Sequence, residues 1–291
     1  MAFLKTRKGF FMSKIILILS LVLFNCGIGF ADTRIPRYIS LAPSTTEILF
    51  ALGLDDQIVG VSTFCNYPLK AKDKPKVGNF SQPNMEKIIS LAPDVVFCTG
   101  LEQSPVIRQL RELKVKVCVS DPANMQELFV SIREIGSLTG KIKEAESLIS
   151  GMKQEIEKVQ AKVKPVTLEK RPTVFVEYWF NPLMSAGKGS FIDELVTLAG
   201  GVNIAGDMSK PYSYFSPELV IKRNPQVIIL AYMVNSQDLL SLSQRLGWSD
   251  ISAVKNNRVY NDINSDLLLR PSPRIVQGLK LLHDKFYPEN E

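Results

Sequence analysis

Two glutamates stand at matching places in two similar phrases of the sequence. Residues 84–97 read NMEKIISLAPDVVF and residues 216–229 read SPELVIKRNPQVII. In each phrase a polar residue, Asn84 or Ser216, comes two positions before a glutamate, and an aliphatic pair, a proline and an apolar run follow. Two carboxylates repeated in this way can form ion pairs with cationic groups of a partner, such as arginine side chains.

Both glutamates fall in the first turn of an expected helix. Asn84 and Ser216 are favoured N-cap residues, and a carboxylate in the first turn is stabilised by the positive end of the helix dipole. Local helix stability alone therefore explains Glu86 and Glu218. If the two phrases belong to related lobes, however, the carboxylates emerge at the same end of each lobe and form two separated docking points for a basic surface.

The single histidine limits the enzymatic chemistry open to this chain. We expect His283 to have a partly exposed structural role, because it lies beside the apolar stripe of an expected C-terminal helix. A serine or cysteine hydrolase needs a base near its nucleophile, and the sequence has no GxSxG motif. Zinc and manganese sites draw on several histidines and cysteines. We therefore expect no catalytic residues, no metal site and no cofactor.

Strand and helix patterns alternate along the first half of the chain. Such alternation predicts a parallel sheet with helices on both faces. The expected strands are residues 38–42, 58–62, 94–98 and 116–120. Four helices are expected: two at residues 44–52 and 104–113, and two more that begin at residues 84 and 124.

A second α/β unit and a long connecting helix follow. Apolar residues recur at alternating steps of three and four residues between the two halves, which predicts one amphipathic helix and favours a rigid strut over a coiled coil. We expect two α/β lobes with largely parallel sheets, a ligand cleft between them, and lobe boundaries at residues 32–140 and 169–291 around a helix at 141–168. The second unit has expected strands at 173–179, 226–232 and 258–263 and expected helices from 190, from 216, near 238–246 and at 273–286.

The first residues have the three parts of an export signal, with basic residues, an apolar run at 15–24 and small residues. This run is too short to span a bilayer. We expect residues 1–31 to be removed by cleavage after Ala31, giving a periplasmic protein; a membrane anchor through lipidated Cys26 is the alternative. Cleavage removes four positive charges, so the formal net charge falls from +6 to +2 and no nucleic-acid partner is expected.

The remaining cysteines, Cys65, Cys98 and Cys118, allow at most one disulfide within the chain. Cys98 and Cys118 fall in neighbouring expected strands and could face each other. Buried thiols that behave as small apolar groups are the simpler interpretation.

The order of motifs resembles one known family. Residues 37–68, RYISLAPSTTEILFALGLDDQIVGVSTFCNYP, and residues 77–97, VGNFSQPNMEKIISLAPDVVF, resemble the first lobe of the helix-backbone class of substrate-binding proteins that serve ABC importers. The stretches FNPLMSAGKGSF, SPELVIKRNP and SDLLLRPSPR continue this resemblance, so that it covers residues 34–288. Within this class the similarity is greatest to members that carry cobalamin.

The resemblance implies a carrier and not an enzyme. Such a protein would bind cobalamin, or a related corrinoid, as its transported ligand and deliver it as a monomer to an ABC transporter permease dimer with its ATPase. In this family one glutamate of each lobe docks onto arginines of the permease, and the matching residues are Glu86 and Glu218. The repeated phrase would then suit a two-fold symmetric transporter.

The same resemblance implies the ligand contacts. Aromatic side chains can cover a large planar ligand, and an arginine can bond to an amide oxygen or a carboxylate. Asp266 and Arg270 are four residues apart, however, and could form a local ion pair instead. Phe80 and Tyr212 stand where the family is expected to have tryptophan. The implied contacts are Pro43, Ser44, Phe64, Phe80, Met184, Tyr212, Asp266 and Arg270.

Two other functions stay open on the sequence. A haem or ferric-siderophore carrier would use the same fold, with tyrosine oxygens available for iron. An exported enzyme or structural protein built on two α/β lobes belongs to a different class.

Overall fold

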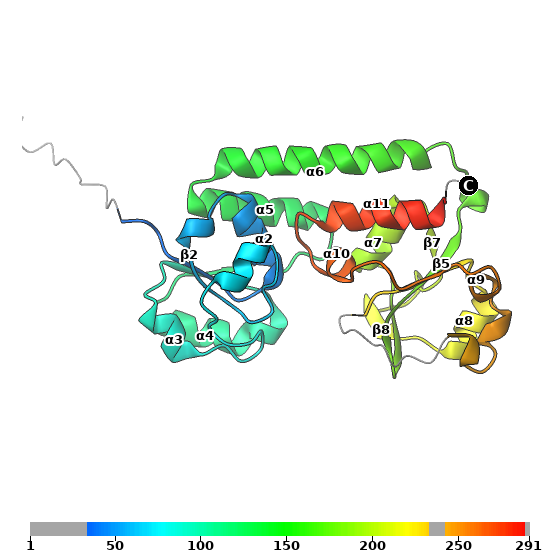
Figure 1. Ribbon diagram of the computed structural model, residues 1–291, viewed down its shortest axis with the longest axis horizontal. Coiled ribbons are helices and arrows are strands. Elements are labelled where there is room, and N and C mark those ends of the chain that lie inside the picture. The colour runs from blue at the N-terminus through cyan, green and yellow to red at the C-terminus, as the bar shows by residue number, and fades with distance from the viewer. Residues whose placement is uncertain (1–33, 233–241, 289–291) are drawn as a thin grey trace, which may run out of the picture. The chain divides into compact units, whose positions relative to one another are not determined.

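The computed structural model describes residues 34–232 and 242–288 (Figure 1). All the described helices and strands belong to one compact unit, Pro36–Glu291. The expected signal peptide, residues 1–31, lies outside the described residues. In the part of the chain that is described, no helix combines the length and the apolar character of a membrane span.

A parallel sheet forms the N-terminal lobe, with its strands in the order β2, β1, β3, β4. Its helices pack on both faces, as the alternation of strands and helices predicts. The strands are β1 (Tyr38–Ser40), β2 (Ile58–Val61), β3 (Val95–Cys98) and β4 (Val117–Val119), and the helices are α2 (Pro43–Ala51), α3 (Met85–Ser90), α4 (Ser104–Glu112) and α5 (Met125–Thr139).

Side chains along these strands alternate between two apolar layers. Tyr38 and Phe97 point to the face covered by α2 and α5. Ile39 and Val96 point to the opposite face, where apolar residues of α3 and α4 cover them. Short 3-10 turns connect the elements at η2 (Asp55–Gln57), η3 (Leu69–Asp73) and η4 (Leu101–Gln103).

The C-terminal lobe has a parallel sheet core to which an antiparallel pair of strands is added. Strands β5 (Thr173–Phe180), β9 (Val227–Leu230) and β10 (Val259–Tyr260) are parallel, and β7 (Val202–Asn203) joins β5 in the same direction. The helices are α7 (Phe191–Leu198), α8 (Pro217–Arg223), α9 (Ser252–Lys255), α10 (Asp266–Leu269) and α11 (Ile275–Phe286), with 3-10 turns η5 (Leu168–Lys170), η6 (Leu242–Gln244) and η7 (Trp248–Asp250).

The antiparallel addition consists of β6 (Leu183–Ala186) and β8 (Tyr212–Tyr214). It was not predicted, because neither residues 183–186 nor residues 212–214 were among the expected strands. The helix expected near residues 238–246 falls partly outside the described residues, and Leu242–Gln244 form only a 3-10 turn.

The repeated phrase forms the same structure in both lobes. The side chains of Asn84 and Ser216 accept hydrogen bonds from the N–H groups three residues later, at 2.9 and 3.4 Å, and so cap α3 and α8. After each helix, a residue in the left-handed region, Ala92 with φ 43° or Asn224 with φ 45°, stands immediately before a proline. The strands β3 and β9 then begin at the same distance along the chain from that proline. The two lobes are therefore related units.

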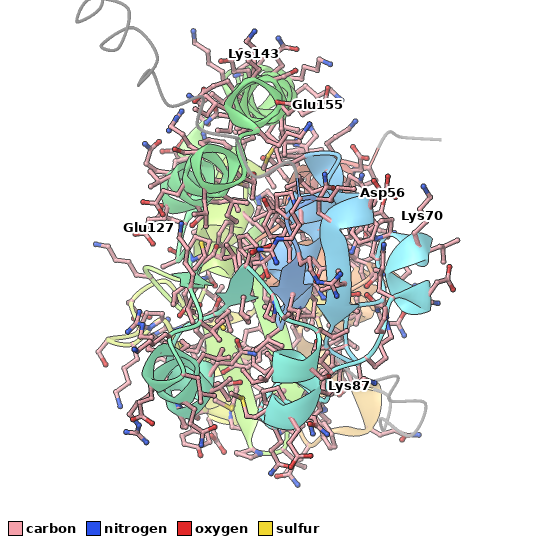
Figure 2. The ribbon with its side chains drawn as sticks, turned by 90° about the vertical axis from the view of Figure 1, so that its left-hand side faces the viewer. Asp56, Lys70, Lys87, Glu127, Lys143 and Glu155 are labelled. Carbon is pink, nitrogen blue, oxygen red and sulfur yellow. The ribbon has the colours of Figure 1, made fainter. Side chains whose placement is uncertain are left out.

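A single helix, α6 (Ile142–Val163), connects the lobes, which confirms the expectation of one long helix. It lies beside α5 and α11 (Figure 1). Its buried residues, such as Ile149 and Val159, belong to one apolar cluster that also includes residues of both sheets. Figure 2 shows Lys143 on the side of α6 that faces away from the sheets. The connecting helix is thus part of a core shared by both lobes.

Cys98 and Cys118 do not face each other. Cys118 lies opposite Phe97 in the register and packs in the layer with α2 and α5, whereas Cys98 packs in the layer with α3 and α4. Residues on opposite faces of a sheet cannot form a disulfide, so a bridge between these two is excluded. Both thiols are free, and burial raises the pKa of Cys98 to about 12 and that of Cys118 to about 11.

The close approach of α5 to α6 depends on Gly136. A Cβ atom at this position would lie 2.5 Å from the Cβ of Ala145 and 2.9 Å from the carbonyl oxygen of Lys141. Gly151 in α6, by contrast, has no atom within 4 Å of the place where its Cβ would lie.

We expect Gly136→Ala and Gly151→Ala to have opposite effects on stability. Alanine ordinarily stabilises a helix relative to glycine by about 1 kcal/mol, and Gly151→Ala should raise the free energy of unfolding by up to that amount. Gly136→Ala should lower it by about 1–3 kcal/mol, because α5 and α6 must move apart. Urea unfolding of both variants measures these changes, and stabilisation by Gly136→Ala would contradict the packing.

Candidate functional site

The turn that carries Pro43 and Ser44 is held by a cluster of buried hydroxyl groups. It joins the carboxyl end of β1 to the start of α2. The hydroxyl groups of Thr45 and Thr46 each donate to the carbonyl oxygen of Ala42 at 3.0 Å. Ser40 connects them, since its Oγ atom lies 2.8 Å from both threonine hydroxyls. Pro43 and Ser44 are thereby presented, partly exposed, on a rigid backbone.

Phe64 lies in the next connection, after β2. Its side chain is exposed, at 56% of its full area. The neighbouring Cys65 is buried and anchors the loop through contacts of its sulfur with the hydroxyl groups of Thr46 at 3.1 Å and Ser62 at 3.2 Å. An exposed aromatic ring on an anchored loop is available for contact with a ligand.

Met184 and Tyr212 come together on the antiparallel addition to the C-terminal sheet. Met184 pairs with Tyr214, and Ala186 pairs with Tyr212, so Met184, Tyr212 and Tyr214 point to one face. Tyr178 of β5 joins this face: its hydroxyl group lies 3.7 Å from the sulfur of Met184, and its ring meets that of Tyr212 edge-on at 5.4 Å. We call these four residues the tyrosine face.

The tyrosine face extends what the sequence predicted. Tyr178 and Tyr214, of which Tyr214 is 69% exposed, were not among the predicted ligand contacts. Desolvation on the sheet raises the pKa of both Tyr178 and Tyr212, so their phenols stay protonated at neutral pH. Residues two apart in a strand point to the same face, so Met184 with Ala186 and Tyr212 with Tyr214 could have indicated this face if the two short strands had been recognised.

A buried ion pair supports the end of β5. The carboxylate of Glu177 is fully buried and accepts hydrogen bonds from Arg245 Nη1 at 2.7 Å and Nη2 at 2.8 Å, and a short one from the hydroxyl group of Tyr232. Burial, followed by the charge of Glu177, raises the pKa of Tyr232. This cluster fixes the strand end from which Tyr178 projects.

Asp266 and Arg270 form the ion pair that their spacing predicts as an alternative. Arg270 Nη2 lies 2.9 Å from Asp266 Oδ1. Arg270 Nη1 donates at 2.7 Å to the side-chain oxygen of Asn66 in the N-terminal lobe. The planar guanidinium group is thus oriented by acceptors from both lobes, and a ligand acceptor would meet an arginine already held in place.

Glu47 was not predicted, yet its carboxylate connects α2 to the segment that follows the C-terminal sheet. Its side chain is buried. The carboxylate accepts from Arg274 Nη2 at 2.5 Å and Nε at 2.8 Å, and from the hydroxyl group of Ser272 at 2.7 Å. Arg274 also lies over the ring of Tyr67 at 3.6 Å. We call Glu47, Ser272 and Arg274 the lobe clasp.

Glu86 and Glu218 are both exposed in the first turns of α3 and α8. The hydroxyl group of Ser216 donates a short hydrogen bond to Glu218, and this bond lowers the pKa of that carboxyl. Both side chains are therefore accessible to a partner. Their docking role stays a prediction.

His283 has a structural role, but it is buried rather than partly exposed. Its Nδ1 atom lies 3.0 Å from the carbonyl oxygen of Ala199, and its ring packs against Tyr287. Among the described residues, no group of three or more histidine, cysteine, aspartate or glutamate side chains is arranged to hold a metal ion.

Comparison with known proteins identifies relatives over most of the chain. The family model for periplasmic binding proteins matches residues 39–264. An uncharacterized ABC transporter substrate-binding lipoprotein of Bacillus subtilis, YvrC, is 35% identical over 87% of this chain and 80% of its own. The vitamin B12-binding protein of Salmonella typhimurium is 29% identical over 85% of this chain and 88% of its own.

Solved structures give the same fold. A possible iron-binding (periplasmic solute-binding) protein of Staphylococcus epidermidis has 33% identity and a TM-score of 0.77, covering 86% of this chain and 98% of that one. The periplasmic heme-binding protein RhuT of Roseiflexus has 26% identity and the same TM-score, covering 87% and 98%. Both similarities extend over the two lobes and the connecting helix.

We expect Glu47→Gln to destabilise the protein strongly, because it removes the buried charge that pairs with the partly buried guanidinium of Arg274. Removing one partner of a buried ion pair costs about 3 kcal/mol or more. Glu146→Gln is the matched control: Glu146 pairs with Arg133 on the surface, and its loss should change stability little. Equal unfolding midpoints for the two variants in urea would contradict the clasp.

Proposed function

Because the chain belongs to the periplasmic binding protein family and is an extracytoplasmic substrate-binding protein of an ABC transporter, we propose that its ligand is cobalamin or a related corrinoid. The tyrosine face is the observation that carries this proposal. Three aromatic rings and a methionine on one sheet face offer a wide, partly apolar contact for a planar macrocycle.

Polar groups complement this face. A corrin ring carries amide side chains, and the guanidinium of Arg270 has donors that can bond to amide oxygens. Phe64 and Phe80 offer further rings on the N-terminal lobe. The name of the Salmonella relative, a vitamin B12-binding protein, supports the same ligand.

A ferric ligand, such as haem or a siderophore complex, is the second candidate. The phenolic oxygens of Tyr178, Tyr212 and Tyr214 favour it, because tyrosine oxygen is a known ligand of haem iron. His283 does not favour it, since its ring is buried against Ala199 and Tyr287. The names of the Staphylococcus and Roseiflexus proteins include iron and heme binding.

For export, we propose cleavage after Ala31 and a free periplasmic protein, with the lipoprotein form through Cys26 as the alternative. The name of the Bacillus relative supports the lipoprotein form. The proposed partner is a permease dimer with its ATPase, and the proposed docking residues are Glu86 and Glu218.

The ligand can be identified by its absorption spectrum. Protein incubated with cyanocobalamin or haemin and then desalted should retain the corrinoid bands, with one ligand per chain by calorimetry. Retention of a Soret band alone would favour the ferric candidate, and retention of neither ligand would contradict both.

We expect Tyr212→Ala and Phe80→Ala each to weaken cobalamin binding by about 1–3 kcal/mol, because each removes one aromatic contact. Tyr212→Phe is the matched control: it keeps the ring and should keep the affinity. If the protein instead binds haemin through the Tyr212 phenol, Tyr212→Phe should lose as much affinity for haemin as Tyr212→Ala. Calorimetric titration of the three variants distinguishes these outcomes.

The docking role predicts loss of uptake without loss of ligand binding. Glu86→Lys and Glu218→Lys should each reduce cobalamin uptake by cells, and the double variant should reduce it further, because attraction to a basic permease surface becomes repulsion. Glu112→Lys, on the exposed side of α4, is the control for added charge and should transport normally. Normal uptake by a folded double variant would show that these glutamates only stabilise their helices.

A further inference from the structure

Gln103 places a buried amide at the carboxyl end of the N-terminal sheet. It is the last residue of η4, directly before α4, and its side chain is fully buried. Its Oε1 accepts a hydrogen bond from the N–H of Thr99 at 2.9 Å. Its Nε2 donates to the carbonyl oxygens of Phe80 at 2.8 Å and Leu41 at 3.2 Å. Both amide hydrogens and the oxygen are thereby engaged.

These three partners belong to three different connections. Leu41 follows β1 and leads directly into the turn with Pro43 and Ser44. Phe80 lies between β2 and α3, and Thr99 follows β3. In open parallel α/β sheets, ligands lie outside the carboxyl ends of the strands, where such connections meet. One side chain therefore ties together the loops on the ligand-facing edge of this sheet.

Stability of the neighbouring helix does not require this amide. Gln103 occupies the N-cap position of α4 but makes no side-chain cap bond to it. Instead α4 is anchored by Val106, Ile107 and Leu110, which are buried against the sheet. All three bonds of the Gln103 amide go to the connecting loops.

We propose that Gln103 is a positioning residue for ligand binding, fixing the backbone at Phe80 relative to the turn that begins at Leu41. This inference rests on the proposed function, because Phe80, Pro43 and Ser44 are its proposed ligand contacts. Loops held in the binding geometry before the ligand arrives lose less conformational entropy on binding, which raises affinity. The bound and free proteins would thus have the same arrangement of these three loops.

The test replaces Gln103 by an apolar residue of similar size. Gln103→Met leaves the N–H of Thr99 and the carbonyl groups of Phe80 and Leu41 without their partner. Amide hydrogen exchange should become faster at residues 41–44, 78–82 and 99–102 together, with the C-terminal lobe unchanged. Affinity for cyanocobalamin should fall about tenfold. Gln109→Met, at an exposed position of α4, should leave both measurements unchanged.

Gln103→Ala is the second variant, in case Gln103→Met folds poorly. It removes all three bonds without adding a charge and leaves space for water to reach the freed groups, so the affinity should again fall. A double-mutant cycle separates positioning from general destabilisation. In the background of Phe80→Ala, Gln103→Met should lower affinity by a smaller factor than in the wild type, whereas an equal factor in both backgrounds would overturn the positioning role.

The outcomes for this inference and for the proposed function are distinct. Wild-type protein that binds neither cyanocobalamin nor haemin would overturn the proposed function, and with it the positioning role. If it binds haemin alone, the cobalamin proposal is overturned and the affinity of the Gln103 variants is measured for haemin. If the wild type binds cyanocobalamin, unchanged exchange in the three loops of Gln103→Met overturns the inference alone. Faster exchange with unchanged affinity for cyanocobalamin also overturns it, because loosening the three loops would then have no effect on ligand binding.

Discussion

The buried carboxylate of Glu47 is the constraint on which the arrangement of the two lobes depends. A carboxylate removed from water costs several kcal/mol unless it is paired and hydrogen-bonded. Glu47 lies in α2 of the N-terminal lobe, but the arginine and serine that satisfy it come from the segment that follows the C-terminal sheet. This segment must therefore return to the N-terminal lobe before α11 packs against α6. The same return brings Arg270 to Asn66.

The two related lobes share one apolar core and carry equivalent surfaces. Each lobe has a capped short helix, a left-handed residue before a proline and a central strand, at the same offsets along the chain. Because the repeat extends to the backbone conformation, Glu86 and Glu218 occupy equivalent positions on their own lobes. The shared core along α6 links the lobes through buried side chains rather than through a linker alone. The proposed docking to a permease would therefore use two side chains that belong to one connected structure.

Local signals in the sequence predicted the capped helices, the long connecting helix and most strands of the parallel sheets, because caps and periodicity act over a few residues. The strands β6 and β8 were missed, since each is short and their pairing joins distant parts of the chain. For the same reason the partners of Glu47 and Gln103 could not be predicted. Met184 and Tyr212 were expected separately as ligand contacts, and only the strand pairing revealed the face that they share with Tyr178 and Tyr214.

A crystal structure of the protein with bound cyanocobalamin would show where the ligand lies. We expect a corrin ring against the tyrosine face, with the ring of Phe80 on the side of the N-terminal lobe and an amide oxygen of the ligand bonded to Arg270. The loops tied by Gln103 should keep the arrangement that they have without ligand. A corrin ring bound elsewhere, with no contact to Tyr212 or Arg270, would rule out the proposed ligand site.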